Sequence, residues 1–235
     1  MNILGAIFPL RNFIERNNSE QSIFEHLQYT YSFARTCLLR GDADQCFRSL
    51  LFQSSLSYAS IGKRVCFYTP LPIQTIPSLV HKLIPNSLLS ANLHLIEFHY
   101  LPTLIDVHKH LINTSCDIII IDGYLEFPLF KQQEDLFKII SSCALLKDIY
   151  DYLKNKFHNN DLILLCSCTC SESWMANVEQ RGLFDLSIHI DMLENGDYHA
   201  DIHILSKKKI SCAFNFRISR NEIMPLFATI QHHYK

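Results

Sequence analysis

Short apolar runs alternate along the chain with longer stretches that mix apolar and polar residues. The apolar runs predict strands, and the intervals between them have the length and mixed pattern of helices. The most pronounced run is Ile118–Ile121, four consecutive isoleucines whose side chains would occupy both faces of a sheet. A strand that is apolar on both faces belongs inside a parallel sheet with helices on either side. The pattern therefore predicts an α/β domain.

Strands and helices are expected to alternate through most of the chain. The expected strands are Thr36–Arg40, Arg64–Thr69, Leu93–Tyr100, Asp117–Asp122 and Leu162–Ser167. The expected helices are Ala43–Ser60, Ile73–Leu83, Pro102–Asn113 and Gln132–His158, with another from Ser19 to about Ala34. This rhythm is typical of right-handed β–α–β units around a mostly parallel sheet.

The last part of the chain has a different pattern. Three short alternating segments follow one another at Asp185–Met192, Tyr198–Ser206 and Ser211–Ile218. Asn195-Gly196-Asp197 joins the first two, and Asn-Gly is a strong signal for a tight hairpin. We therefore expect a mostly parallel sheet flanked by helices, with a C-terminal antiparallel hairpin extension. The expected domains are a leader at 1–35, a core at 36–226 and a tail at 227–235.

Amino-acid composition limits the class of protein and the compartment in which it is expected. The 235 residues are 48% hydrophobic and 19% charged, which fits one globular domain with a sizeable core. No apolar stretch reaches the ~18 residues that span a membrane, and the first ten residues lack the features of a signal peptide. Nine cysteines, an odd number scattered through apolar runs, favour reduced thiols in the cytosol or nucleus. The net charge of −2 excludes a global basic field, so DNA binding would need a local patch or a partner.

A nucleotide site is suggested by Asp122, which ends the isoleucine strand. In phosphate-binding ATPases an apolar strand ending in aspartate helps to hold magnesium. The matching phosphate loop would be Gly41–Arg48, but of G-x-x-x-x-G-K-[S/T] only Gly41 fits. Cys46 replaces the second glycine, Phe47 the lysine, and Arg48 the magnesium-binding hydroxyl. The degenerate nucleotide site Gly41, Arg48 and Asp122 therefore predicts no catalytic residues, no cofactor and no ordinary ATP binding.

Two further carboxylates argue against an incoming polyphosphate. Asp42 and Asp44 lie within the same segment. One like-charge pair at 4 Å costs ~4 kcal/mol at an effective dielectric of 20. A helix dipole contributes only ~0.3–1 kcal/mol in the opposite direction. The alternative interpretation is a plain loop that opens a helix, with Asp42 or Asp44 as its cap.

The succession of motifs resembles a known family. The relevant blocks are the segment from Val65 to Pro77 with its Pro-Ile-Gln-Thr-Ile-Pro, Ile96–Ile105, the Asp122 strand, and Phe214–Pro225. Over about residues 36–226 the chain resembles the SWIM-domain-associated ATPase subunit of the metazoan Shu complex, a small paralogue of the RecA-type recombinases. The resemblance implies a RecA-like core, pairing with a SWIM-domain zinc protein, binding to the strand-exchange recombinase and to single-stranded DNA, and a nuclear role in homologous recombination.

Two departures limit what the resemblance implies. Better-preserved members keep an intact phosphate loop, so ATPase activity is not expected here. The family also docks an aromatic ring through Phe-x-x-Ala, whereas this chain has Phe52-Gln-Ser-Ser55. Phe52 is a candidate for recombinase binding, and the alternative is a core residue on an amphipathic helix.

The DNA-binding candidates are the basic residues of the C-terminal part. They are Lys207, Lys208, Lys209, Arg217 and, in the segment after the fifth strand, Arg181. Trp174 in that segment is a candidate to stack on bases. The alternatives are a solvated lysine-rich hairpin turn and a core position for the tryptophan.

Other constellations indicate no site. Cys166, Cys168 and Cys170 would share one strand face, but buried reduced thiols explain them better than a metal does. His94, His99, His108 and His110 are interpreted as partly exposed, and no metal is expected. Glu97 could act as the base that polarises water in an active ATPase, but with a broken phosphate loop it is interpreted as a solvated or hydrogen-bonded strand carboxylate.

The sequence predicts an adaptor without ATP turnover, and two rivals remain. One is a pseudo-ATPase subunit of the Elongator ring, which acts in transfer-RNA modification and has a RecA-like fold. The other is an active ATPase with a remodelled loop that uses Arg48 or Lys63.

Overall fold

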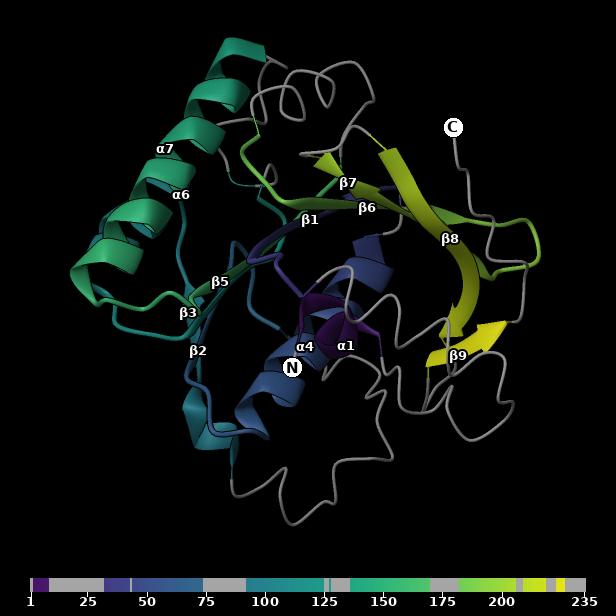
Figure 1. Ribbon diagram of the computed structural model, residues 1–235, viewed down its shortest axis with the longest axis horizontal. Coiled ribbons are helices and arrows are strands. Elements are labelled where there is room, and N and C mark those ends of the chain that lie inside the picture. Colours follow the sequence, from purple (N-terminus) through teal and green to yellow (C-terminus); the bar gives the residue numbers. More distant parts are fainter. Residues whose placement is uncertain are drawn as a thin grey trace.

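The computed structural model describes residues 2–8, 32–42, 44–73, 92–124, 127, 136–169, 182–205, 209–218 and 223–226. Within these residues nine strands form one sheet in the order β3-β2-β4-β5-β1-β6-β7-β8-β9 (Figure 1). No described helix is long and apolar enough to span a membrane.

Six strands run in parallel. They are β1 (Thr36–Gly41), β2 (Val65–Thr69), β3 (Ile96–Tyr100), β4 (Ile118–Ile121), β5 (Ile163–Cys168) and β6 (Leu186–Met192). Each of the first five lies within a predicted strand or differs from it by about one residue, except at Leu93–Leu95. These three residues form a 3-10 helix, and Leu93 is 45% exposed, so its hydrophobicity did not signal a buried strand.

The antiparallel extension follows β6. It consists of β7 (Tyr198–Ile204), β8 (Lys209–Ile218) and the short edge strand β9 (Ile223–Leu226). The predicted hairpin turn is present: Leu193 N–H donates to the Asp197 carbonyl, and Gly196 has φ +79. The predicted fold class is therefore confirmed. The sequence did not indicate β9, which contains Pro225 and lies where proline is tolerated, at a sheet edge.

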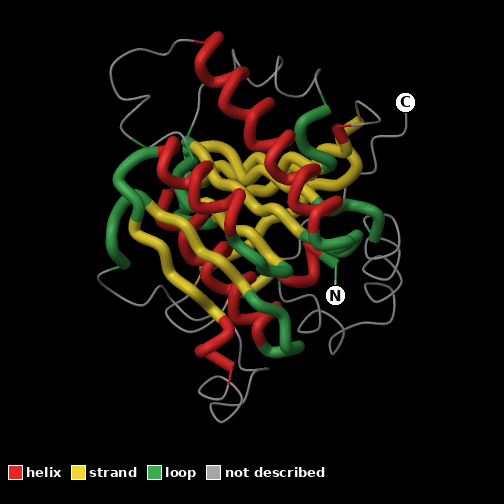
Figure 2. Tube along the Cα trace, turned by 90° about the vertical axis from the view of Figure 1, so that its left-hand side faces the viewer, coloured by secondary structure: helices red, strands yellow, loops and turns green. Residues whose placement is uncertain are grey.

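Helices cover both faces of the sheet (Figures 1 and 2). One face packs against α1 (Ile3–Ile7) and α4 (Asp44–Ala59), and the other against α6 (Leu104–Asn113) and α7 (Leu136–Lys156). The isoleucine strand divides between the two cores. Ile118 and Ile120 join the α1/α4 core, while Ile119 and Ile121 join the α6/α7 core, as the sequence predicted.

The first residues of the chain contribute to the core. Asn2 caps α1 by accepting a hydrogen bond from Gly5 N–H at 2.8 Å. Four residues of α1 are buried, and the helix packs beside α4. The predicted helix from Ser19 to about Ala34 lies outside the described residues except at its end, where Ser32 and Phe33 form a turn. Apart from Ile73, the predicted helix Ile73–Leu83 also lies outside the described residues.

Candidate functional site

The candidate nucleotide site lies where parallel strands end. Asp122 follows β4, Gly41 ends β1, and Ser167 near the end of β5 lies between them because β5 separates the two strands. Open α/β sheets bind their ligands outside this carboxyl edge. The geometry of these side chains therefore decides whether a nucleotide can be held.

An internal ion pair occupies the carboxylate. Arg48, from the second turn of α4, places Nε 2.6 Å from Asp122 Oδ2. The Ser167 hydroxyl donates to Asp122 Oδ1 at 3.2 Å and accepts a hydrogen bond from Gly123 N–H at 2.9 Å. The Asp122 side chain is only 4% exposed. The structure thus brings together two predicted site residues, 74 positions apart, and pairs the magnesium-type carboxylate with a cation from the protein itself.

The connection that would wrap a phosphate is too short. β1 ends at Gly41 and α4 begins at Asp44, so only Asp42 and Ala43 separate them. A phosphate loop needs a longer turn whose backbone N–H groups surround the ligand. Asp44 is the first residue of the helix, and the position before it, Ala43, lies outside the described residues, so the expected capping by Asp42 or Asp44 stays a prediction.

Two of the positions that differ from the phosphate-loop motif, Cys46 and Phe47, lie in the core. Cys46 and Phe47 are 1% and 2% exposed and belong to the α1/α4 core. Phe47, at the lysine position, therefore fills hydrophobic space in place of reaching a phosphate. Burial raises the pKa of the Cys46 thiol, so Cys46 stays neutral.

Gly41 is required by packing between strands. Its φ is +129, and a Cβ at this position would lie 2.1 Å from the Ile190 carbonyl oxygen. Gly41 and Ile190 are partners in the β1–β6 pairing. The one match to the phosphate-loop motif therefore has a structural cause that needs no phosphate.

Neither cation of the active-ATPase rival is placed to help a nucleotide. Arg48 pairs with Asp122. Lys63 Nζ lies 3.7 Å from Asp117 Oδ1, which precedes β4 and therefore belongs to the opposite end of that strand from Asp122. The described residues thus offer no second cation in the role that the sequence suggested.

Phe52 lies in the core. Its residue is 7% exposed, and its ring stacks on Phe98 with centroids 6.1 Å apart. Ser55 is fully buried and donates its hydroxyl hydrogen bond to the Phe52 carbonyl. Docking of Phe52 into a partner would empty this core position, so the packing supports the alternative interpretation of Phe52 as a core residue.

Of the basic DNA-binding candidates, the structure describes only the backbones of Lys209 and Arg217. Arg181, Lys207 and Lys208 lie outside the described residues, as do Trp174 and Cys170. Lys209 begins β8 and Arg217 stands near its end, eight positions apart. Eight strand residues span roughly 26 Å, so the two backbones lie at opposite ends of the strand.

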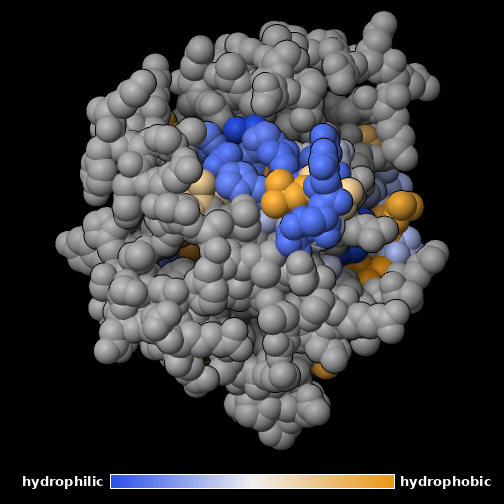
Figure 3. Space-filling model, turned by 90° about the vertical axis from the view of Figure 1, so that its right-hand side faces the viewer, coloured by the Kyte–Doolittle hydropathy of each residue, from blue (hydrophilic) through white to orange (hydrophobic). Residues whose placement is uncertain are grey.

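Figure 3 faces the side of the molecule that carries the antiparallel extension. Hydrophilic side chains of the described residues gather there around a few hydrophobic ones. Near the β6–β7 turn, Asp191 is half-buried and Glu194 is exposed.

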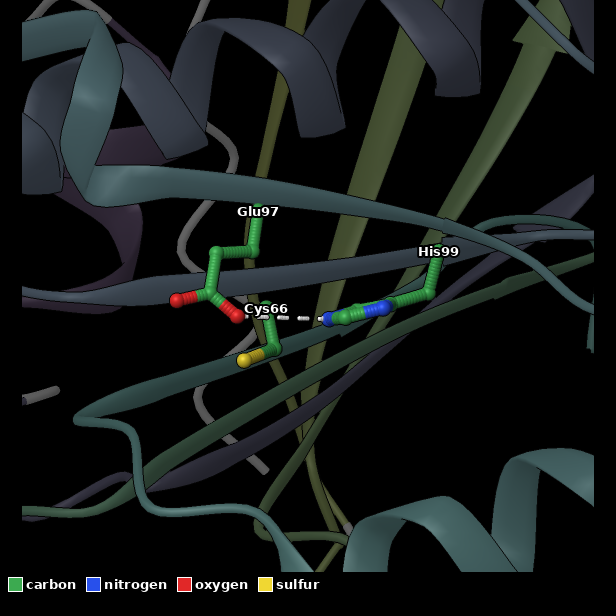
Figure 4. A group of neighbouring side chains, drawn as sticks. All are labelled: Cys66, Glu97 and His99. Carbon is green, nitrogen blue, oxygen red and sulfur yellow. Dashed lines mark ion pairs between the residues drawn. The ribbon is translucent and has the colours of Figure 1, made fainter.

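A second polar cluster lies at the other edge of the sheet (Figure 4). Cys66 on β2 is the register partner of Glu97 on β3, and His99 lies two residues further along β3. One ligand atom from each of the three side chains lies within 4.8 Å of the others. The His99 ring also lies beside His110, with centroids 4.3 Å apart. We call Cys66, Glu97 and His99 the Cys66 cluster.

The thiols and rings of this region affect one another. Cys116 donates a hydrogen bond that lowers the pKa of the Cys66 thiol, although burial acts in the opposite direction. The same hydrogen bond, together with burial, raises the pKa of Cys116. Burial and the nearby His110 lower the pKa of His99.

Sequence reasoning missed the Cys66 cluster. The available signal was Glu97-x-His99, two polar residues on one face of a strand, but the β2–β3 register could not be read from the sequence. His108 was interpreted as partly exposed, and this is wrong. Its residue is 7% exposed, and burial lowers its pKa to about 4. Cys166 and Cys168 are buried and form no disulfide among the described residues, as expected.

No protein-family model and no curated protein matches the chain. Several solved structures are similar to it. The crystal structure of the flagellar accessory protein FlaH from Methanocaldococcus jannaschii matches with a TM-score of 0.53 and 15% identity, covering 83% of this chain and 90% of that chain. The fold is RecA-like. A KaiC-like protein from Pyrococcus horikoshii OT3 matches with a TM-score of 0.55 and 14% identity, covering 82% and 89% of the two chains.

The RecA-like assignment locates the degenerate site within its fold. In RecA-like ATPases the first strand leads into the phosphate loop and a central strand ends in the magnesium-binding aspartate. In this fold the elements at these places are β1, α4 and β4, and the ion pair joins Arg48 of α4 to Asp122, which follows β4.

Proposed function

We propose that this RecA-like domain is a non-catalytic adaptor that does not turn over ATP. The observation that carries the proposal is the 2.6 Å ion pair between Arg48 and Asp122. Magnesium would have to displace a guanidinium from a carboxylate that is almost fully shielded from water. Magnesium would therefore compete with a cation that already neutralises this carboxylate and donates a hydrogen bond to it.

The adaptor proposal extends to homologous recombination in the nucleus. Its support is the motif resemblance over about residues 36–226. In this proposal the domain pairs with a SWIM-domain zinc protein and stabilises the strand-exchange recombinase on single-stranded DNA. In this proposal the Phe52 ring stays in the core, where it stacks on Phe98, and other residues make the docking surface.

An adaptor of this kind acts through binding free energy alone. A protein that binds the DNA-bound recombinase more tightly than the free recombinase shifts the population toward the filament. The shift is limited by the difference between the two affinities, and no phosphoryl transfer is required. Loss of the nucleotide site is therefore compatible with the role.

DNA contact in the proposal involves the β7–β8 turn. Each phosphate neutralised by a lysine would make the dependence of log K on log salt steeper by about 0.7 for a single strand. Replacing Lys207, Lys208 and Lys209 together by Gln should therefore lower the salt slope of the assembled complex by about two units. An unchanged slope would remove this turn from the proposal.

The test is affinity purification of the full chain from native cells, with identification of the co-purifying proteins. Recovery of a SWIM-domain protein and the recombinase is the expected result. The matched control is Phe52→Leu, which keeps a hydrophobic side chain in the core and should retain both partners. Recovery of Elongator subunits without these partners would contradict the recombination role and leave only the RecA-like fold.

A further inference from the structure

We infer that Cys66, Glu97 and His99 form a binding site for a divalent transition-metal ion, with Zn²⁺ as the best match. A thiol, an imidazole and a carboxylate converge there from two neighbouring strands (Figure 4). This ligand set selects a borderline-soft ion over Mg²⁺ or Ca²⁺, which prefer oxygen ligands alone. The site is separate from the Arg48–Asp122 pair and does not depend on the proposed function.

The spacing of the ligand atoms fits the geometry of zinc. His99 Nε2 lies 3.6 Å from Glu97 Oε2. Two ligands with Zn–N and Zn–O bonds of about 2.1 Å at a tetrahedral angle are separated by about 3.4 Å. The three ligand atoms lie within 4.8 Å of one another, so only a modest contraction closes the site.

His99 has an unused buried nitrogen. Nε2 is shielded from water and has no hydrogen-bond partner among the described residues, although it lies near the Glu97 carboxylate. A buried polar atom in this state requires an explanation, and a bound ion is one of the standard ones. A metal at the centre of the Cys66 cluster would use this nitrogen and the carboxylate together.

Cys116 supplies a second sulfur next to the first. Its side chain interacts with the Cys66 thiol, so the two sulfurs are neighbours. The fourth position of a tetrahedral ion is then open to Cys116 or to water. Glu97 has a side chain that is 66% exposed, so an ion can enter from the solvent side.

Such an ion would have a structural role. β3 is the edge strand of the sheet and pairs only with β2 among the described strands. A metal joining Cys66 to Glu97 and His99 would tie this edge strand to its neighbour. Natural proteins protect exposed edges because an unpaired edge can recruit other chains.

The test uses Co²⁺ as a spectroscopic substitute for Zn²⁺ on the reduced full chain. One equivalent of Co²⁺ should give a thiolate-to-metal charge-transfer band and the intense visible bands of tetrahedral cobalt, both displaced by Zn²⁺. X-ray absorption of the zinc form should show one or two sulfur ligands, with nitrogen and oxygen completing the shell. The X-ray measurement needs no variant and therefore does not depend on variants folding.

Variants then assign the ligands. Cys66→Ser and His99→Gln should each lower Zn²⁺ affinity by at least about 100-fold, more than is typical for a residue that only supports a ligand. The matched controls Cys143→Ser and His199→Gln remove the same groups elsewhere and should bind as the unchanged protein does. Circular dichroism of each variant verifies that it folds.

Three results would overturn the inference. The first is the absence of a thiolate–cobalt band at stoichiometric metal. The second is equal loss of binding in the control variants, which would place the metal elsewhere. The third is a Cys66–Cys116 disulfide in the native protein that persists under mild reductant and excludes the ion.

Discussion

Two polar groups in one sheet differ in whether the protein supplies their hydrogen-bond partners. At the carboxyl edge, the Asp122 carboxylate accepts hydrogen bonds from Arg48 and Ser167. At the β2–β3 edge, His99 Nε2 has no hydrogen-bond partner within the described residues, and a thiol and a carboxylate stand beside it. At the site that the sequence pattern suggested, the carboxylate is paired within the protein, and at the cluster that it missed, three possible metal ligands lie together.

The difference shows that position within a fold does not establish activity. The carboxyl edge of a RecA-like sheet is where a nucleotide would be sought. There the polar side chains contribute to stability by pairing with one another. Unsatisfied buried atoms are the better indication of a binding site, because they carry a cost that a ligand would remove.

The largest expected effect concerns Gly41. Gly41→Ala places a Cβ 2.1 Å from a backbone oxygen, at φ +129. Overpacking and backbone strain should together lower the free energy of unfolding by about 4 kcal/mol, measured by denaturant titration. Gly196→Ala is the matched control, because its φ is +79 but nothing lies within 4 Å of the added Cβ. It should cost only about 1 kcal/mol. Equal losses would show that β1–β6 packing does not require Gly41.

The next prediction concerns removal of the ion pair between Arg48 and Asp122. Arg48→Met should destabilise the domain by about 3 kcal/mol, since Asp122 would stay buried without its charge partner. The double variant Arg48→Met, Asp122→Asn removes the uncompensated charge and should recover most of this loss. A double-mutant cycle in urea measures both. Coupling below about 0.5 kcal/mol would mean that the pair contributes little to closing the site.

Zn²⁺ binding at the Cys66 cluster should stabilise the folded protein. At a free Zn²⁺ concentration 100 times the dissociation constant, the folded state should gain about 2.7 kcal/mol. A melting curve would record this as an increase of several degrees, and His99→Gln should abolish it. An equal increase in the variant would assign the stabilisation to another part of the chain.

His108 sharpens the comparison because it is also buried and its Nε2 also has no described hydrogen-bond partner. Burial lowers its pKa to about 4, so the folded protein keeps it neutral while the unfolded chain protonates it near pH 6.5. The unfolded state therefore binds more protons between pH 6.5 and 4, and stability falls as the pH is lowered through this window. His108→Met should reduce that loss by roughly 1–3 kcal/mol in denaturant titrations at several pH values. Metal binding should be unchanged, and an unaltered pH dependence would contradict the burial argument.

The sequence predicted the sheet well because its signals are local. The isoleucine run and Asn195-Gly196-Asp197 identify a doubly covered strand and a hairpin from neighbouring residues alone. β9 was missed because a four-residue edge strand containing Pro225 has little local signal. The start of β3 was misplaced because Leu93 is apolar but exposed.

The sites were predictable only in part. Motif spacing placed Arg48 and Asp122 at one nucleotide site, but their ion pair depends on how α4 lies over the sheet. The Cys66 cluster depends on the β2–β3 register, which pairs Cys66 with Glu97 and cannot be read from either strand alone. Contacts between segments that are distant in the sequence decide which candidate residues lie together in a site.

Calorimetric titration of the full chain with magnesium–ATP tests the central claim most directly. The closed Arg48–Asp122 pair predicts no saturable heat up to millimolar nucleotide, with or without magnesium. Saturable, magnesium-dependent binding that Asp122→Asn abolishes would contradict the account, because it would show that the carboxylate still holds a nucleotide-bound metal.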